Sequence, residues 1–262
     1  MSKVLATDLD GTLIPLSKKP ENEHDLDTLR AELQAKQVTL TFVTGRHLES
    51  VQDAITQHRL PLPAWIICDV GTSVYRRDES GSIELATAYV EHLRSLVGDF
   101  PTSRVHELFA EETDLRKQEE EKQGEFKLSY YCDADQLRKI IKSVRDTITR
   151  HEAPYHVIGS VDPFNGDGLI DLLPTNVSKA YALQWWTEHA GMDNSELVFS
   201  GDSGNDLAAM TAGYRTIVVG NAALDLVETV RAHYEHEPAL LYVAEKPATS
   251  GVLAGCRHFG LI

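Results

Sequence analysis

Cysteine is scarce in this sequence, and its placement excludes the usual cysteine-based scaffolds. Only three occur among 262 residues, at Cys68, Cys132 and Cys256. They are odd in number, widely separated and outside any paired metal-ligand spacing, so they predict neither a disulfide framework nor a zinc site. We therefore expect the protein to work in a reducing compartment, the cytoplasm.

Long hydrophobic runs and clusters of basic residues are also missing. No stretch of about 18 uninterrupted apolar residues occurs that could span a bilayer, and the opening MSKVLATDLDG has no apolar signal core. Membrane insertion and secretion are therefore not expected. The chain has 40 acidic and 25 basic residues, a net charge of −15 and no Lys/Arg cluster, which argues against a nucleic-acid partner. An anionic ligand would have to be attracted locally, by a cation, a metal or a helix N-terminus.

What is present is the composition of an ordinary globular protein, with 42% apolar and 25% charged residues. Apolar runs that predict strands alternate with segments that predict helices, which is typical of a parallel α/β sheet. The expected strands are VLATDL, VTLTFVT, WIICDVG, LVFSGD and TIVVGNA, and the expected helices include Glu23 to Lys36, His47 to His58 and Leu207 to Ala212. Polar residues follow these strands at their C-terminal ends, where open α/β sheets bind ligands.

The middle of the chain has a different pattern. Between about Glu79 and Asp167 it is more charged, with alternating segments KLSYYCD and YHVIGSV around a helix-like Ala134 to Arg150. The sequence thus predicts a Rossmann-like core at residues 1–80 and 168–262, with an α+β domain inserted at 81–167. The charged run Glu111 to Gln123 predicts a solvated helix or loop.

Two aspartates follow the first expected strand. Asp8 and Asp10 lie in LATDLDGTL, and alternation along the strand end would point both carboxylates the same way. Two neighbouring carboxylates require a cation or a shared proton, so the pair indicates a divalent ion. An ordinary Asp-Gly turn is the alternative.

Two further elements carry groups that suit a phosphate. Thr44, Gly45 and Arg46 follow the strand TFV, where a hydroxyl and free backbone N–H groups could hold phosphate oxygens. Lys179 lies in the first turn of an expected helix, against the helix dipole, which favours a functional reason for the charge. The alternatives are an unremarkable strand-to-helix turn and a surface lysine.

A fourth element, LVFSGDSGND, places Asp202 and Asp206 after a strand, with Gly201 before Asp202 and Gly204 between the two aspartates. Both carboxylates could face a cation at the sheet edge, although Asp202 could also serve only as a helix cap. The four elements together decide the interpretation, because each is at a strand or helix end and each supplies a part that phosphoryl transfer needs.

With DLDGT, the TGR threonine, a lysine at a helix start and GDxxxD in this order, the sequence resembles the haloacid dehalogenase-like superfamily. The resemblance implies that Asp8 is the nucleophile, Asp10 the general acid and base, and Lys179 the cationic partner of a phosphate. Thr44, with Gly45 and Arg46, would bind that phosphate. Magnesium would be the cofactor, and its implied ligands are Asp8, Asp10, Asp202 and Asp206.

The position of the insert resembles that of the large cap in sucrose-phosphate phosphatases and related sugar-phosphate phosphatases. The strings DVGTSVY, EFKLSYYCD, IDLLP and SGVLAGCRHFGL support this subgroup. By the resemblance, Lys127, Gln118 and Asn205 would contact the sugar or phosphate, and the substrate would be sucrose-6-phosphate or a related disaccharide or glycosyl phosphate. Ala180 departs from the family, which usually has glycine there, and Thr175 to Ser178 depart from its commonest loop.

Three alternative functions are compatible with these motifs. A phosphosugar mutase would use the same four motifs. A phosphatase could act on another small phosphorylated metabolite, and a non-catalytic sugar-phosphate sensor could retain the scaffold. The expected assembly is a monomer or a homodimer.

Overall fold

The structure is a computed structural model that describes residues 4–161 and 165–262. The chain divides into two compact units. The core unit consists of the residues up to Leu85 together with Lys179–Ile262, and the cap unit consists of Ala86–Ser178. No helix in the described ranges combines the length and the apolar character needed to cross a membrane.

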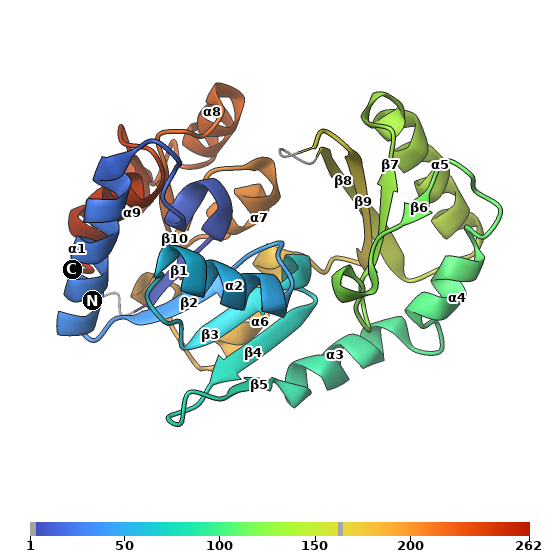
Figure 1. The fold of residues 1–262 in the computed structure, drawn as a ribbon, viewed down its shortest axis with the longest axis horizontal. Helices are drawn as coiled ribbons and strands as arrows, with labels where there is room; N and C mark the ends of the chain where they lie inside the picture. Colours follow the sequence, from blue (N-terminus) through green and yellow to red (C-terminus); the bar gives the residue numbers. More distant parts are fainter. Residues whose placement is uncertain (1–3, 162–164) are drawn as a thin grey trace. The chain divides into compact units, whose positions relative to one another are not determined.

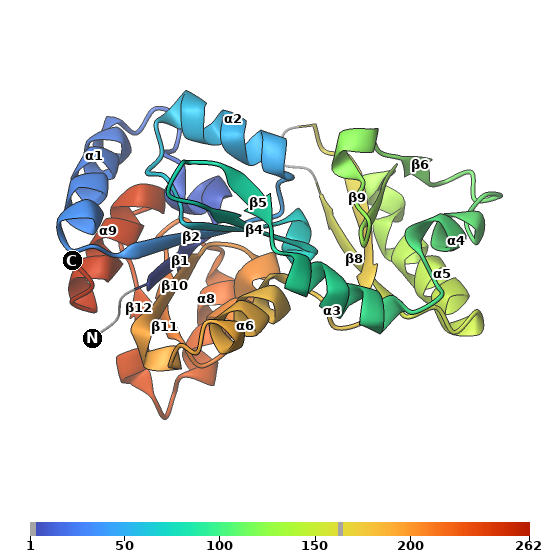
Figure 2. The ribbon, with the colours of Figure 1, turned by 90° about the horizontal axis from the view of Figure 1, so that it is seen from below.

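The core unit is built on an eight-stranded sheet with the order β12-β11-β10-β1-β2-β3-β4-β5. Figure 1 labels β1 to β5 and β10, and Figure 2 labels β11 and β12. Its strands are β1 (Val4–Thr7), β2 (Thr39–Val43), β3 (Trp65–Cys68), β4 (Ser73–Arg77), β5 (Ile83–Leu85), β10 (Leu197–Gly201), β11 (Arg215–Val218) and β12 (Leu241–Val243). Neighbours from β12 to β3 pair in parallel, and β4 and β5 add an antiparallel edge. This sheet confirms the predicted Rossmann-like α/β class.

Helices cover both faces of the core sheet. They are α1 (Pro20–Ala35), α2 (Leu48–His58), α6 (Lys179–His189), α7 (Leu207–Met210), α8 (Leu224–His233) and α9 (Ala248–His258). Helices α1, α2 and α9 lie on one face, and α6 and α8 lie on the other (Figure 2). Helix α1 begins at Pro20, earlier than the expected Glu23, because proline fits the first turn of a helix without losing a hydrogen bond.

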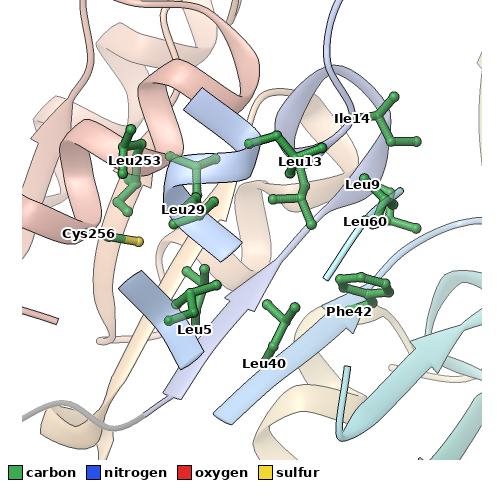
Figure 3. Close-up of a cluster of buried hydrophobic side chains, with 14 of the residues drawn as sticks. Leu5, Leu9, Leu13, Ile14, Leu29, Leu40, Phe42, Leu60, Leu253 and Cys256 are labelled. Carbon is green, nitrogen blue, oxygen red and sulfur yellow. The ribbon is translucent and has the colours of Figure 1, made fainter. Parts of the chain in front are cut away.

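The largest apolar cluster lies between the sheet and the helices α1, α2 and α9. Leu26, Leu29 and Leu33 recur along one side of α1 and are all buried, which is the pattern of a helix packed on a core. Figure 3 shows Leu29 of α1 with Leu253 and Cys256 of α9, near Leu5 of β1 and Leu40 and Phe42 of β2. Close packing of this kind holds the strands, and therefore the residues at their ends, in fixed positions.

The cap unit has an antiparallel sheet of its own, with the order β6-β7-β9-β8. Its elements are α3 (Thr87–Val97), α4 (Thr102–Glu107), β6 (Arg116–Lys117), β7 (Leu128–Cys132), α5 (Leu137–Arg150), β8 (Tyr155–Val161) and β9 (Gly168–Pro174). Buried Ile140, Val144 and Ile148 lie at spacings of four along α5, which contacts β8. The α+β character expected for the insert is therefore present.

Both ends of the cap unit, and one element inside it, differ from those expected. The cap unit begins at Ala86, not at residue 81, because β5 pairs with β4 and so belongs to the core sheet. The cap unit ends at Ser178, not at residue 167, because β9 pairs with β7 and β8 and so belongs to the cap sheet. Within the charged run Glu111 to Gln123, Arg116 and Lys117 form the edge strand β6, paired with Tyr130 and Tyr131. The expectation of a helix or loop is therefore wrong for these two residues. A charged run does not exclude a strand, because charged side chains are common on edge strands, where they discourage pairing with further strands.

Candidate active site

The site lies where the direction of the sheet connections reverses. Strand β1 lies between β2 and β10. The chain continues from β1 to β2 on one side, and β10 is the first strand of the half of the sheet on the other side. In open α/β sheets the ends of such strands form the ligand crevice. Asp8 follows β1, Asp202 follows β10 and Thr44 follows β2. Their side chains are therefore attached to neighbouring strand ends despite their separation in the sequence.

Asp8 is buried and rigidly placed. Its side chain is 5% exposed, and its backbone N–H donates to Ser200 O at 2.9 Å. Its carboxylate Oδ1 accepts a hydrogen bond from Lys179 Nζ at 2.7 Å. Burial raises the pKa of Asp8 well above its ordinary value; Lys179 opposes the rise, and Asp206 and Asp202 add to it. Additional positive charge is needed to keep this carboxylate ionised.

Lys179 is the first residue of α6, and its ammonium group is enclosed by acceptors. Its Nζ donates to Asp8 Oδ1 at 2.7 Å, Asp206 Oδ1 at 2.8 Å and Asn205 Oδ1 at 3.1 Å, which matches the three donors of an ammonium group. Burial alone would lower its pKa, but Asp206 and Asp8 outweigh that effect and raise it. Lys179 is therefore a buried cation and not a surface solubiliser.

Asp202 and Asp206 complete the acidic side of the site. Asp206 Oδ2 accepts from the backbone N–H groups of Asp202 and Ser203 at 3.2 and 3.3 Å, which fixes the turn after β10. Thr12 Oγ1 donates to Asp202 Oδ1 at 2.8 Å. Burial raises the pKa of Asp202 to about 6, although the bond from Thr12 lowers it.

Asp8, Asp202 and Asp206 form a cluster that could hold a cation. Each offers one carboxylate oxygen, and these oxygens lie within 4.8 Å of one another. Hard divalent cations prefer oxygen ligands of this kind. Burial, with a smaller contribution from the neighbouring carboxylates, raises the pKa values of Asp8 and Asp202, and a bound cation would favour their ionised forms. The residues present therefore fit a metal ion.

Asp10, which the resemblance implied as a fourth metal ligand, is not part of this cluster. Strand β1 ends at Thr7, and Leu9–Leu13 form a short helical turn (η1), so strand alternation does not orient the two aspartates. Asp10 Oδ2 and Oδ1 accept hydrogen bonds from Arg46 Nε at 2.7 Å and Arg46 Nη2 at 2.6 Å. The two aspartates thus have different cationic partners, Lys179 for Asp8 and Arg46 for Asp10.

The turn that carries Asp10 requires a glycine at position 11. Gly11 has a φ of 75°, and a Cβ atom there would collide with the carboxylate of Asp202. The DG of DLDGT therefore brings the loop after β1 against the loop after β10.

Thr44 and Gly45 lie at the end of β2. Thr44 is buried, and its Oγ1 accepts from the backbone N–H of Arg46 at 3.2 Å. A hydroxyl can donate while it accepts, so this group can still bond an anionic oxygen. The backbone N–H of Thr44 donates to Ile67 O, and that of Val70 to Thr44 O, so the next strand fixes this turn. Val70 has a φ of 58°, a conformation that is strained for a β-branched residue and often found beside functional sites.

Gln118 and Lys127 lie in the cap unit. Both are buried there, and Gln118 Nε2 donates to Tyr130 O at 3.1 Å. The backbone groups of Lys127 pair with those of Gly124. Their expected roles toward a substrate stay predictions. Asn205, in contrast, bonds Lys179 inside the core site.

Sequence reasoning missed three supporting residues, Thr12, Ser50 and Asn221. Ser50 Oγ accepts from Arg46 Nη1 at 3.0 Å, and Asn221 Nδ2 donates to Gly11 O at 2.9 Å. Thr12 lies in DLDGT and Asn221 lies in TIVVGNA, so both are close to predicted strand ends. Their side chains are uncharged, and the catalytic and metal-binding groups were predicted mainly from charged residues. Ser50 had no signal apart from its place one helical turn after Arg46.

Comparison with known proteins agrees with this architecture. The model of the sucrose-6F-phosphate phosphohydrolase family matches residues 1–260. A putative HAD-like hydrolase from Nitrosococcus oceani is 32% identical over 265 residues, covering 98% of this chain and 71% of that protein. A mannosylfructose-phosphate phosphatase from Agrobacterium fabrum is 28% identical, covering 99% of this chain and 97% of that protein.

The sucrose-phosphatase from Synechocystis, solved in complex with sucrose and phosphate, has the same fold. The TM-score is 0.78 at 23% identity, with 99% of both chains covered. The chain therefore belongs to the sucrose-6F-phosphate phosphohydrolase family of the haloacid dehalogenase-like superfamily, and it is a phosphoric monoester hydrolase.

Proposed function

We propose that this sugar-phosphate phosphatase of the haloacid dehalogenase-like superfamily is magnesium-dependent and acts through an aspartyl-phosphate on Asp8. The observation that carries the proposal is the buried Asp8, which is bonded to Lys179 and grouped with Asp202 and Asp206. A carboxylate nucleophile needs positive charge nearby to approach an anionic phosphate, and this arrangement provides a fixed cation beside a cation-binding cluster.

The reaction would proceed in two half-reactions. In the first, an Asp8 oxygen forms a bond to phosphorus while the bond from phosphorus to the sugar oxygen breaks, and Asp10 gives its proton to that oxygen. In the second, a water oxygen bonds to phosphorus, the Asp8–phosphorus bond breaks, and Asp10 takes the proton of the water. Lys179 holds the Asp8 carboxylate in place and offsets phosphate charge, while Thr44 and the backbone N–H of Gly45 hold phosphate oxygens.

Magnesium would be held by Asp8, Asp202 and Asp206. When bound, it would neutralise the negative charge shared by these carboxylates and the phosphate. We propose Mg²⁺ because a small, hard ion that keeps some of its waters suits a few carboxylates together with a substrate phosphate.

Removing the metal is expected to abolish phosphate release. Stabilisation by a metal ion is worth several kcal/mol, so exhaustive chelation should lower kcat/KM by at least about 10²-fold, and added Mg²⁺ should restore it. Mg²⁺ should also raise the melting temperature of the wild type but not that of Asp202→Asn, because the ion stabilises only a protein that binds it. Full activity after chelation would refute the proposed metal site.

The proposed substrate is sucrose-6-phosphate or a related disaccharide or glycosyl phosphate. The support is the family match and the mannosylfructose-phosphate phosphatase relative. We expect a kcat/KM about five- to tenfold higher for sucrose-6-phosphate than for glucose-6-phosphate, since one additional hydrogen bond to the second ring is worth about 1 to 1.4 kcal/mol. A phosphate-release assay on both sugars, with mannosylfructose phosphate as a third, measures the ratio. Equal efficiencies on all three would refute selectivity for two-ring substrates.

Lys127 is the cap residue we propose to contact the sugar phosphate. Lys127→Met keeps most of the apolar stem in its buried position and should lower kcat/KM for sucrose-6-phosphate more than for p-nitrophenyl phosphate. Lys142→Met, on an exposed lysine of α5 that pairs with Asp146, is the matched control and should change neither value. An equal loss on both substrates would assign Lys127 to cap stability and not to sugar recognition.

A further inference from the structure

Arg46 makes a two-pronged contact with Asp10. Its Nε and Nη2 each donate to a different oxygen of the Asp10 carboxylate, at 2.7 and 2.6 Å. A guanidinium fork of this kind fixes the plane of the carboxylate as well as its position, which a single hydrogen bond does not. The Asp10 side chain is 46% exposed, so packing alone does not hold it.

The guanidinium group is itself anchored. Its third nitrogen, Nη1, donates to Ser50 Oγ at 3.0 Å and to Ser50 O at 3.3 Å. The backbone of Arg46 is fixed as well, since its N–H donates to Thr44 Oγ1 and its carbonyl accepts from the N–H of Asp69. Ser50 belongs to α2, which is packed on the sheet through Val51 and Ala54. Arg46 thus connects a rigid helix to the Asp10 carboxylate.

These contacts leave Arg46 poorly suited to its expected role as a phosphate ligand. All three guanidinium nitrogens already have protein acceptors, and two of them are committed to a carboxylate. A phosphate could take the two donors of the Nε–Nη2 fork only by displacing Asp10, and the Nη1 donors only by displacing Ser50. In the core unit, Thr44 and the backbone N–H of Gly45 remain as groups that can bond phosphate oxygens. Lys179, whose three N–H donors also have acceptors, would act on the phosphate through its charge.

We propose that Arg46 is a positioning residue, which holds the Asp10 carboxyl group in one orientation. In that orientation the protonated group gives its proton to the leaving oxygen, and the resulting carboxylate then takes the proton of the attacking water. This inference rests on the proposed role of Asp10. Arg46 thereby serves proton transfer through its contact with Asp10, and Ser50 anchors that contact.

The inference predicts a leaving-group-dependent defect. For Arg46→Ala we expect kcat/KM on phenyl phosphate to fall about 10- to 10²-fold, since misplacing a catalytic group by about 1 Å can cost 10². On p-nitrophenyl phosphate, whose leaving group departs with little protonation, the loss should stay within about threefold. Because kcat/KM includes steps only up to departure of the leaving group, this ratio isolates the first proton transfer. Arg46→Lys keeps the charge but not the fork and should behave like Arg46→Ala.

A double-mutant cycle with Asp10→Asn supplies the decisive comparison. If Arg46 acts through Asp10, adding Arg46→Ala to Asp10→Asn should leave the ratio between the two aryl phosphates unchanged. Two results would overturn the inference and make Arg46 a phosphate-binding charge. The first is an equal fall in kcat/KM on both aryl phosphates that persists when Arg46→Ala is added to Asp10→Asn. The second is a full recovery of kcat/KM in Arg46→Lys. The aryl phosphates test the role of Arg46 whatever the natural substrate is. If the wild-type protein hydrolysed aryl phosphates but no sugar phosphate, that result would contradict the proposed substrate and not the role of Arg46.

Discussion

Asp8→Asn is expected to eliminate turnover, with kcat falling by at least about 10⁴-fold, because a neutral amide oxygen is a very poor nucleophile toward phosphorus. The substitution should leave the fold intact, since the asparagine Oδ1 can still accept the hydrogen bond that Lys179 donates to Asp8 Oδ1. Steady-state phosphate release and a thermal melt of the same preparation measure both properties.

Asp10→Asn is the matched control for this prediction, because it removes a carboxylate from the same loop without removing the nucleophile. Loss of a proton-transfer group costs about 10²- to 10⁴-fold, and less for p-nitrophenyl phosphate than for a sugar phosphate. Equal defects in the two variants on both substrates would show that the aspartates do not have separate roles. Residual covalent labelling of Asp8→Asn by substrate would exclude Asp8 as the nucleophile.

Lys179→Met is expected to damage both activity and stability. The side chains of Lys179, Asp8 and Asp206 are exposed by only 1%, 5% and 0%, so methionine would leave two buried carboxylates without their cation. Removing one member of a buried ion pair typically destabilises a protein by about 3–5 kcal/mol. Urea unfolding measures this cost. Lys246→Met, at an exposed lysine of the core unit 3.7 Å from Asp25, is the control and should cost no more than about 1 kcal/mol.

The stability deficit of Lys179→Met should depend on pH. Burial already raises the pKa of Asp8 with Lys179 present, and removing the cation raises it further. The folded variant then binds a proton that the unfolded chain releases, so its stability falls as pH rises above the unfolded value near 4. The deficit should therefore be smaller at pH 5 than at pH 8. A deficit that is small and independent of pH would show that Lys179 does not compensate buried carboxylates.

The central parts of the site could be predicted because they follow strand ends. Parallel strands bring their C-terminal ends to one edge, so Asp8, Thr44 and Asp202 could be placed together from local patterns alone. Lys179 could be singled out because a cation at a helix start opposes the helix dipole. Its second partner, Asp206, could not be foreseen, since that contact depends on the packing of α6 beside the turn after β10.

Features that depend on pairing between distant segments were harder to predict. The sequence predicts that residues 168–262 belong to the core, but β9 (Gly168–Pro174) pairs with β7 and β8 and is therefore part of the cap sheet. The contact between Arg46 and Asp10 joins residues 36 positions apart, and neither residue type specifies the other. Lys127 and Gln118 remain predictions, because their roles concern a substrate and not contacts within the chain.

The most direct test of the covalent mechanism is the pre-steady-state reaction of Asp10→Asn with p-nitrophenyl phosphate. Phosphorylation of Asp8 by this substrate needs little proton transfer, whereas hydrolysis of the aspartyl-phosphate needs Asp10 as a base. We therefore predict a burst of p-nitrophenolate close to one equivalent per protein, followed by slow turnover, with acid-stable phosphate located on Asp8 by mass spectrometry. Slow turnover with no burst and no phosphorylated Asp8 peptide would contradict an aspartyl-phosphate intermediate.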